Sequence, residues 1–175
     1  MKEKEAIALL NKAGCSSSVI EHCRIVAEYA RKIALDVDNC ARKRGVPINI
    51  DMNCIIIGGL LHDIGRSKTH GIDHAVVGAR IAVETGLNEK LVSIIERHIG
   101  AGITKDEALA IGLPAKDYLP LTLEEKIVAH ADNLVFGASV GTIDEVVSNL
   151  QKKKLDVKII KRITELNDEI TSMIC

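Results

Sequence analysis

The feature that most constrains the fold is an uncharged stretch that leads directly into a histidine–aspartate pair, CIIIGGLLHDIGR, at residues 54–66. Eight uncharged residues, 54–61, precede His62 and Asp63. An apolar run of this length is typical of a buried element, so we expect the imidazole and the carboxylate to lie inside the protein. Buried polar groups need partners. The pair is therefore either a hydrogen-bonded structural unit or part of a metal site.

Composition favours a globular protein. The chain has 175 residues, of which 47% are hydrophobic and 27% charged, and this suits one domain over residues 1–175 with a sizeable core. Its formal net charge of −1 gives no overall attraction to nucleic acid or to an anionic membrane. The apolar runs are too short to span a bilayer, and the N-terminus shows no signal-peptide pattern. We therefore expect a cytoplasmic protein without membrane association.

Helical periodicity dominates the chain and predicts an all-α fold, a compact multi-helix arrangement with the polar site in its core. Capping residues and glycines mark the expected boundaries. A polar loop is expected at 65–72, and one short helix after Thr104 in an otherwise irregular segment, 100–121. The other expected helices are 3–13, 18–44, 52–62, a helix capped by Asp73 that ends before Gly86, 89–99, 123–133, 143–153 and 156–175.

The cysteines give no sign of a metal-binding motif. There are five of them, at positions 15, 23, 40, 54 and 175, and no Cys-x-x-Cys pair. An odd number without metal-ligand spacing predicts reduced, mostly buried thiols.

Two features bear on nucleic-acid binding. Tryptophan is absent and Phe136 is the only phenylalanine, so no aromatic platform for stacking single-stranded bases is apparent. The basic run Lys152–Lys154 is predicted to be a solvated helix end rather than a binding patch.

Polar residues recur on helix faces that should point inward. Taken alone, each is most simply a hydrogen-bonded core residue or a helix-end residue. Taken together, four histidines and two aspartates from five helices would need a common partner, and metal ions are the simplest such partner. Such imidazole and carboxylate ligands suit Mn, Fe, Co, Ni or Zn rather than Ca. The candidate ligands are His22, His62, Asp63, His74, His98 and Asp132.

These residues and their order resemble the HD-domain superfamily of metal-dependent phosphohydrolases, in the subgroup with an HDIG signature. The resemblance covers about residues 18–135, with the helices of 142–175 expected to pack on this core. It implies two divalent metal ions, with Asp63 bridging them. His22, His62 and Asp132 would complete one site, and His74 and His98 the other. The matching segments are VIEHCRIVAEYARKIA, GGLLHDIGR, HAVVGARIA, IERHIGAG and EKIVAHADNLV.

Such a centre can activate water as a hydroxide that attacks phosphorus, with Asp63 among the catalytic residues. Arg66, Lys68 and Arg97 could neutralise phosphate oxygens, although ordinary solvated charge explains them equally well. Lys68 is the preferred catalytic and substrate-binding candidate because it lies in the polar loop just past the ligands. His70, in the same loop, is either a proton donor or substrate contact or simply exposed.

His130 is not expected to bind the same metal as Asp132. It lies two positions earlier in the chain, and on a helix this separation turns its side chain about 200° away.

We therefore predict a metal-dependent phosphohydrolase acting on a nucleotide or another small phosphorylated substrate. The Gly-Tyr-Pro element of cyclic-dinucleotide phosphodiesterases is missing at RHIGAG, and the Glu-Asp pair of guanosine-tetraphosphate hydrolases is not evident. Two alternatives stay open: a catalytically silent HD module that binds a nucleotide or protein, and an RNA-associated HD protein whose local basic face is hidden in the net charge. The sequence also leaves open the identity of the metal and whether the chain forms a homo-oligomer.

Overall fold

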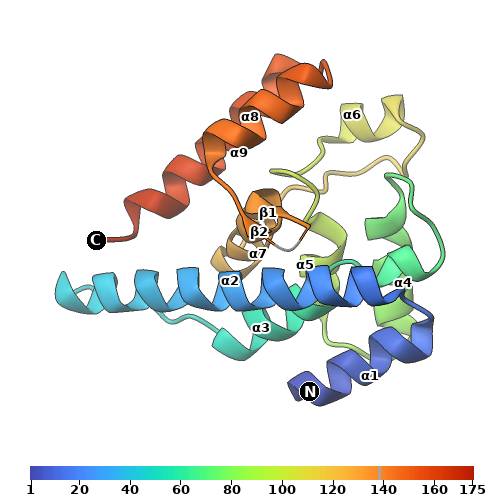
Figure 1. Ribbon diagram of the computed structural model, residues 1–175, viewed down its shortest axis with the longest axis horizontal. Helices are drawn as coiled ribbons and strands as arrows, with labels where there is room; N and C mark the ends of the chain where they lie inside the picture. The colour runs from blue at the N-terminus through green and yellow to red at the C-terminus, as the bar shows by residue number, and fades with distance from the viewer. Residues whose placement is uncertain (138) are drawn as a thin grey trace.

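The computed structural model describes residues 1–137 and 139–175, and Figure 1 shows how its elements are arranged. Helices make up nearly all of the regular structure, so the expected all-α fold is confirmed. No helix within these ranges has both the length and the hydropathy needed to cross a membrane. In chain order the elements are α1 (Glu3–Ala13), α2 (Ser17–Lys43), α3 (Met52–Leu61), the 3-10 helix η1 (Ile64–Ser67), α4 (His74–Glu84), α5 (Glu89–Arg97), α6 (Lys105–Ala110), α7 (Leu123–Leu134), β1 (Val135–Phe136), β2 (Ser139–Val140), α8 (Ile143–Lys152) and α9 (Val157–Ser172).

Side-chain caps explain where most of the helices begin. At the start of α2, for example, the Ser16 hydroxyl accepts a hydrogen bond from the backbone N–H of Val19. Such caps satisfy N–H groups that have no partner within the helix. Asp73 occupies the N-cap position of α4, but its carboxylate accepts from the Thr69 hydroxyl and not from the helix backbone. At six other helix starts a side-chain oxygen accepts a hydrogen bond from a backbone N–H of the first turn, as Ser16 does. These capping residues are Asp51, Asn88, Thr104, Thr122, Thr142 and Asp156.

The long helix α2 crosses the front of the molecule in Figure 1, with α1 and α3 below it and α8 and α9 above it. Helix α3 is central to the core because two adjacent glycines let it approach helices on two sides. A Cβ atom on Gly59 would lie 2.8 Å from the Cα of Ala27 in α2. One on Gly58 would lie 2.7 Å from Cδ1 of Ile94 in α5. The burial expected from the uncharged run is therefore observed, and α3 delivers the His-Asp pair from inside the protein.

Two short elements depart from the sequence expectation. Residues 64–67 form η1, although a polar loop was expected from residue 65 onward. Its first two residues, Ile64 and Gly65, are buried, and this anchors the segment against the core. After α7 the chain forms an antiparallel hairpin in which Val135 pairs with Val140. Strands of two residues are too short to leave an alternating pattern in a sequence.

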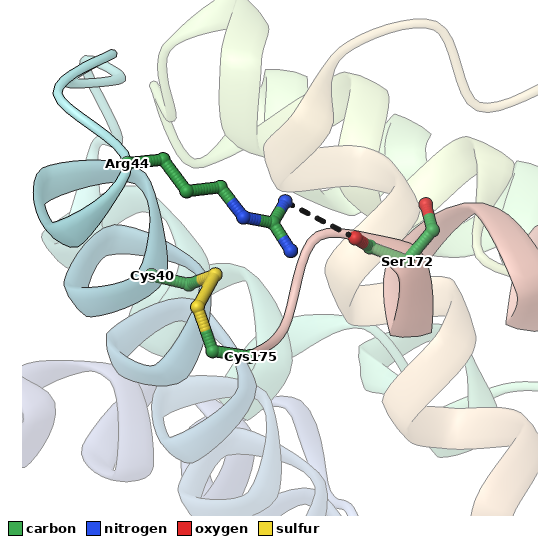
Figure 2. Close-up of a disulfide and its surroundings, with 4 residues drawn as sticks. All are labelled: Cys40, Arg44, Ser172 and Cys175. Atoms are coloured by element: carbon green, nitrogen blue, oxygen red, sulfur yellow. Dashed lines mark hydrogen bonds between the residues drawn. A yellow bond between two sulfur atoms is a disulfide. The ribbon is translucent and has the colours of Figure 1, made fainter.

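Cys40, near the end of α2, forms a disulfide with Cys175 at the end of the chain (Figure 2). Their Cα atoms are 5.4 Å apart. The prediction of reduced thiols is wrong for this pair, because the partners are 135 positions apart and meet only where the end of α9 returns to the end of α2. In the same place Arg44 donates a hydrogen bond to the carbonyl oxygen of Ser172. The remaining cysteines are free, as predicted: Cys15, Cys23 and Cys54.

We predict that Cys175→Ser lowers the free energy of unfolding by about 2–4 kcal/mol, because the disulfide restricts the unfolded chain over most of its length. Urea denaturation of wild type and variant measures the change. Reductant should produce the same loss in wild type and no further loss in the variant. Equal stability of the oxidised wild type and the variant would contradict the proposed constraint.

Candidate metal centre

The six predicted ligands converge where several helices begin or end. His62 and Asp63 follow α3, His74 opens α4, and His98 follows the last residue of α5. These four side chains are buried. The two remaining ligands, His22 in α2 and Asp132 in α7, are 23% and 21% exposed, and they form the open side of the cluster.

The carboxylate of Asp63 lies at the middle of the cluster. Its Oδ1 atom is 3.1 Å from Nε2 of His74 and 3.6 Å from Nε2 of His98. Its Oδ2 atom is 3.8 Å from Nε2 of His62 and 4.0 Å from Nε2 of His22. The two oxygens of one carboxylate thus face two different pairs of imidazoles, which is the arrangement a bridging ligand requires.

Asp132 completes the open side of the cluster. Its Oδ1 atom is 2.9 Å from Nε2 of His22 and 3.4 Å from Nε2 of His62. Two groups therefore have ligand atoms within 4.8 Å of one another: His22, His62 and Asp132, and His62, Asp63 and His98. His74 adjoins the second group, with its Nε2 atom 3.1 Å from Nε2 of His98.

Three of the imidazoles are oriented by the same backbone contact. The Nδ1 atoms of His62, His74 and His98 lie 2.7–2.8 Å from the carbonyl oxygens of the residues three positions earlier. A carbonyl oxygen can only accept a hydrogen bond, so Nδ1 is the donor and, in the neutral ring, Nε2 carries the lone pair. The accepting residues are Gly59, Gly71 and Ile95.

This arrangement points acceptors at acceptors. The lone pairs of His74 and His98 face each other and the Oδ1 atom of Asp63. In the part of the chain that the structure describes, His62 Nε2 and Asp63 Oδ1 are buried without a hydrogen-bond partner. Buried acceptors without a donor are costly, and a cation removes that cost. Because neutral imidazoles and carboxylates suit divalent transition metals, the residues present fit a metal centre.

The protonation of the aspartates also suits metal binding. Although burial acts to raise it, the pKa of Asp63 is held well below its ordinary value by His62, His74 and His98. The pKa of Asp132 is likewise lowered against the effect of burial, by His62 and His22. Both groups therefore remain carboxylates at neutral pH.

The histidines respond to burial and to this negative charge in different ways. Burial acts to lower the pKa of His62, but the negative charge around it, to which Asp132 and Asp63 contribute, raises it well above its ordinary value. In the absence of another cation, a proton on His62 thus compensates the carboxylates. Burial lowers the pKa of His98 and keeps that ring neutral, which is its ligand form.

Gly65, the glycine of the HDIG sequence, sets the distance between η1 and α4. A Cβ atom at this position would lie 1.9 Å from the carbonyl oxygen of His74 and 2.6 Å from the backbone N of Gly78. Both contacts are with backbone, which cannot move aside as a flexible side chain can. Gly65 therefore holds the start of α4, and with it His74, against the segment that carries Asp63.

The basic residues predicted to bind substrate lie in different settings. Arg66 is partly buried, and its Nε donates to Oδ2 of Asp63 at 2.6 Å, so it lies at the cluster but already contacts a candidate ligand. Lys68 and His70 are exposed in the loop that follows. Arg97 instead donates to both carboxylate oxygens of buried Glu125, which also accepts from the N–H of Leu121.

The Arg97–Glu125 pair was not foreseen from the sequence. It ties the end of α5, where His98 lies, to the start of α7, which carries Asp132. Asn133 adds a second tie between these helices by donating to the carbonyl oxygen of Gly100 at 2.9 Å. The sequence signals were weak: Glu125 matches a capping position after Thr122, and Asn133 directly follows a candidate ligand. Both residues fix the ligands of one helix relative to those of the other.

His130 is buried on α7, and burial lowers its pKa to about 4. Neither of the compact ligand groups in the described residues includes it. That His130 does not bind the same metal as Asp132 stays a prediction.

Residues 19–137 match the model of the HD domain, so the chain belongs to the HD-domain family. The chain is 52% identical over 175 residues to an uncharacterized protein of Methanocaldococcus jannaschii, with 99% of each chain covered.

Other curated relatives carry names from RNA biology. A tRNA (cytidine(56)-2'-O)-methyltransferase of Thermoplasma volcanium is 42% identical over 172 residues, which cover 98% of this chain and 47% of the relative. The present chain thus spans about half the length of that protein. Ribonuclease Y of Protochlamydia amoebophila is 27% identical over 124 residues, which cover 68% of this chain and 21% of the relative.

A solved structure confirms the fold. The HD domain of the Listeria monocytogenes phosphodiesterase PgpH, crystallised with cyclic-di-AMP, superposes with a TM-score of 0.52 at 16% sequence identity. The superposition covers 97% of this chain and 95% of that one. At this level of identity the likeness shows a shared helical architecture.

We predict that Gly65→Ala lowers the free energy of unfolding by about 3 kcal/mol, because the methyl group collides with the backbone of α4. Gly86→Ala is the matched control. Gly86 has a φ of +75° but open space around its Cβ position, so that change should cost about 1 kcal/mol. Chemical denaturation measures both values. Equal losses in the two variants would show that the η1–α4 contact is not the constraint described here.

Proposed function

We propose that this HD-domain protein is a metal-dependent phosphohydrolase that cleaves a phosphoester or phosphoanhydride of a nucleotide or of another small phosphorylated molecule. The observation that carries the proposal is the cluster of acceptors around Asp63. Two carboxylates and four imidazoles converge there, and buried Nε2 and Oδ1 atoms lack donors. Without cations these buried acceptors destabilise the fold, whereas with divalent ions the same residues would form a hydrolytic centre.

The ligand groups indicate which residues would hold the metal. His22, His62 and Asp132 would hold one divalent ion, His74 and His98 a second, and Asp63 would contact both. Two ions in such a site supply positive charge for phosphoryl oxygens and lower the pKa of water. The chain itself orients the ligands, through the Nδ1 contacts, and keeps both carboxylates ionised.

Residues beside the cluster would handle the substrate. Arg66 would hold the orientation of Asp63 through its hydrogen bond to Oδ2. Lys68, exposed on the adjoining loop, would place its ammonium group against a phosphate oxygen, and His70 would lie within the same loop to contact the substrate or donate a proton. We assign Arg97 no part in this chemistry because its guanidinium is bound to Glu125.

The choice of a nucleotide as the substrate class is supported by the comparisons. The Listeria HD domain was crystallised with cyclic-di-AMP, and the relatives are named as enzymes that act on RNA. These names describe those proteins, and for this chain they indicate which substrates to test first.

We predict that the protein binds about two equivalents of Mn²⁺ or another divalent transition metal, and that Asp63→Ala removes most of both. The carboxylate contacts both ligand groups, so its loss should affect both ions. His98→Ala should lose one ion, and His70→Ala none. Elemental analysis of metal-loaded, dialysed protein measures the content. Full retention of metal by Asp63→Ala would exclude a bridging role, and an absence of metal in wild type would contradict the proposed centre.

We further predict metal-dependent hydrolysis of at least one nucleotide phosphoester in a panel of mononucleotides, cyclic nucleotides and dinucleotides. Asp63→Ala should lower kcat/KM more than about a hundredfold, since even groups that only support a metal ligand contribute 10- to 100-fold. Lys68→Ala should lower kcat/KM while the metal content is unchanged, and exposed Lys43→Ala is its control. Full metal content without any turnover would favour a silent binding module.

A further inference from the structure

The formal charge of the chain is unevenly distributed. Between residues 152 and 162 there are six basic residues and one acidic residue, a local charge of +5. Because the whole chain carries −1, the remainder carries −6. This segment includes the end of α8, the turn after it and the start of α9, and we call it the α8–α9 corner. Its five lysines are exposed: Lys152, Lys153, Lys154, Lys158 and Lys161.

Most of these lysines form no ion pair with another described residue. Lys161 lies 3.5 Å from Glu165, and Arg162 donates to both oxygens of Glu107. Within residues 1–137 and 139–175, the run Lys152–Lys154 forms no ion pair. The positive charge of the corner is therefore available to a partner.

A hollow of about 830 Å³ lies beside this corner, between α6 and the pair of helices α8 and α9. This volume is within the range of small-molecule sites, about 300–1,000 Å³. Its walls are mainly aliphatic and include the single phenylalanine, Phe136, while Lys152 and Lys153 contribute to its edge. The hollow thus combines an apolar interior with a cationic border.

The hollow also reaches the segments that carry two of the candidate ligands. Its lining contains Ile99 and Asn133, which directly follow His98 and Asp132 in the chain. Among the described residues no candidate ligand itself lines the hollow, so a molecule that fills it would lie against Lys152 and Lys153 and beside the segments that carry His98 and Asp132.

We propose that the α8–α9 corner and this hollow form a binding site for single-stranded RNA. Backbone phosphates would contact the exposed lysines, one nucleoside would occupy the hollow, and a neighbouring phosphodiester would reach the metal centre. Only the contact between a phosphodiester and the metal centre rests on the proposed function, because RNA binding at the corner does not require turnover. It names the substrate class as an oligonucleotide.

The physical requirements of single-strand binding match these features. A positively charged groove follows the backbone, and apolar or aromatic surfaces receive the bases. A duplex would have no unpaired base to place in the hollow. A mononucleotide carries its phosphate next to one nucleoside, so it could not contact the metal centre and extend along the corner. The negative charge of the rest of the chain disfavours non-specific binding elsewhere and confines a polyanion to this face.

The alternative explanation is that lysines at the end of α8 only complement the helix dipole. That explanation covers Lys152–Lys154, but it does not apply to Lys158, the second residue of α9, where the helix dipole disfavours positive charge. Lys161 lies in the next turn, beside Glu165. A cationic face built from the end of one helix and the beginning of the next is better explained by an anionic partner.

The test is RNA binding by the metal-loaded, full-length protein. The probe is a fluorescein-labelled, 12-nucleotide single-stranded RNA with phosphorothioate linkages, which keep the charge and resist hydrolysis. Fluorescence anisotropy measures Kd between 50 and 300 mM salt. The combined change Lys152→Glu, Lys153→Glu and Lys154→Glu should weaken binding about tenfold or more and reduce the slope of log K against log salt by about 2, the value for three lost phosphate contacts.

The matched control reverses three exposed lysines outside the corner, Lys4→Glu, Lys12→Glu and Lys32→Glu. It changes net charge equally and should alter Kd no more than twofold. Equal weakening in both variants, or absence of wild-type binding at 50 mM salt, would overturn the proposal. Binding of the corner to phosphatidylserine vesicles but not to RNA would overturn it as well.

A second measurement separates this proposal from the hydrolase proposal. With metal-loaded protein, the corner variant should lose kcat/KM on unmodified RNA but keep its rate on bis(p-nitrophenyl) phosphate, which is too small to reach the corner. RNA binding that depends on the corner, without hydrolysis of either compound, would support the binding site and contradict the hydrolase. Hydrolysis of both compounds at unchanged rates in the corner variant would contradict the RNA site alone.

Discussion

The structure depends on one electrostatic constraint: lone pairs and carboxylate oxygens meet in a buried centre and need positive charge between them. Backbone carbonyls fix the Nδ1–H donors of His62, His74 and His98, so in their neutral form these rings present only acceptors to Asp63. Rotation of any ring would break its bond to the carbonyl. Ring rotation therefore does not supply the missing donors, and the cluster needs added positive charge, from a proton on His62 or from a metal cation.

The helical scaffold concentrates these groups because helices begin and end at the centre. The carbonyls that accept from His62 and His98 belong to the last turns of α3 and α5, where they have no partner within the helix. Close packing brings those ends together. Gly58 and Gly59 let α3 lie against α5 and α2, and Gly65 lets η1 touch the backbone of α4. The glycines of GGLLHDIGR are therefore part of the site, since they set the distances between the elements that carry its ligands.

Most of the helices and all six candidate ligands could be predicted from the sequence, because both depend on local patterns. Caps such as Ser16 and Thr122 mark helix starts, and periodicity shows which faces turn inward. The features that could not be predicted depend on contacts between distant residues. The Cys40–Cys175 disulfide and the Arg97–Glu125 ion pair join segments whose spacing carries no signal. The hairpin of β1 and β2 was missed because its strands contain too few residues for a period to appear.

The basic run at the end of α8 illustrates the same limit for function. Read along the chain, Lys152–Lys154 resembles any solvated helix end, and the net charge of −1 gives no reason to look further. The fold changes that interpretation, because α9 turns back after residue 156 and adds its own lysines beside a hollow whose lining includes Ile99 and Asn133, the chain neighbours of two candidate ligands. The role of a charged segment depends on the residues that the fold places beside it. In a chain whose remaining residues are acidic overall, a cationic corner with an unpaired lysine run near the candidate metal centre would suit a substrate that carries more than one phosphate.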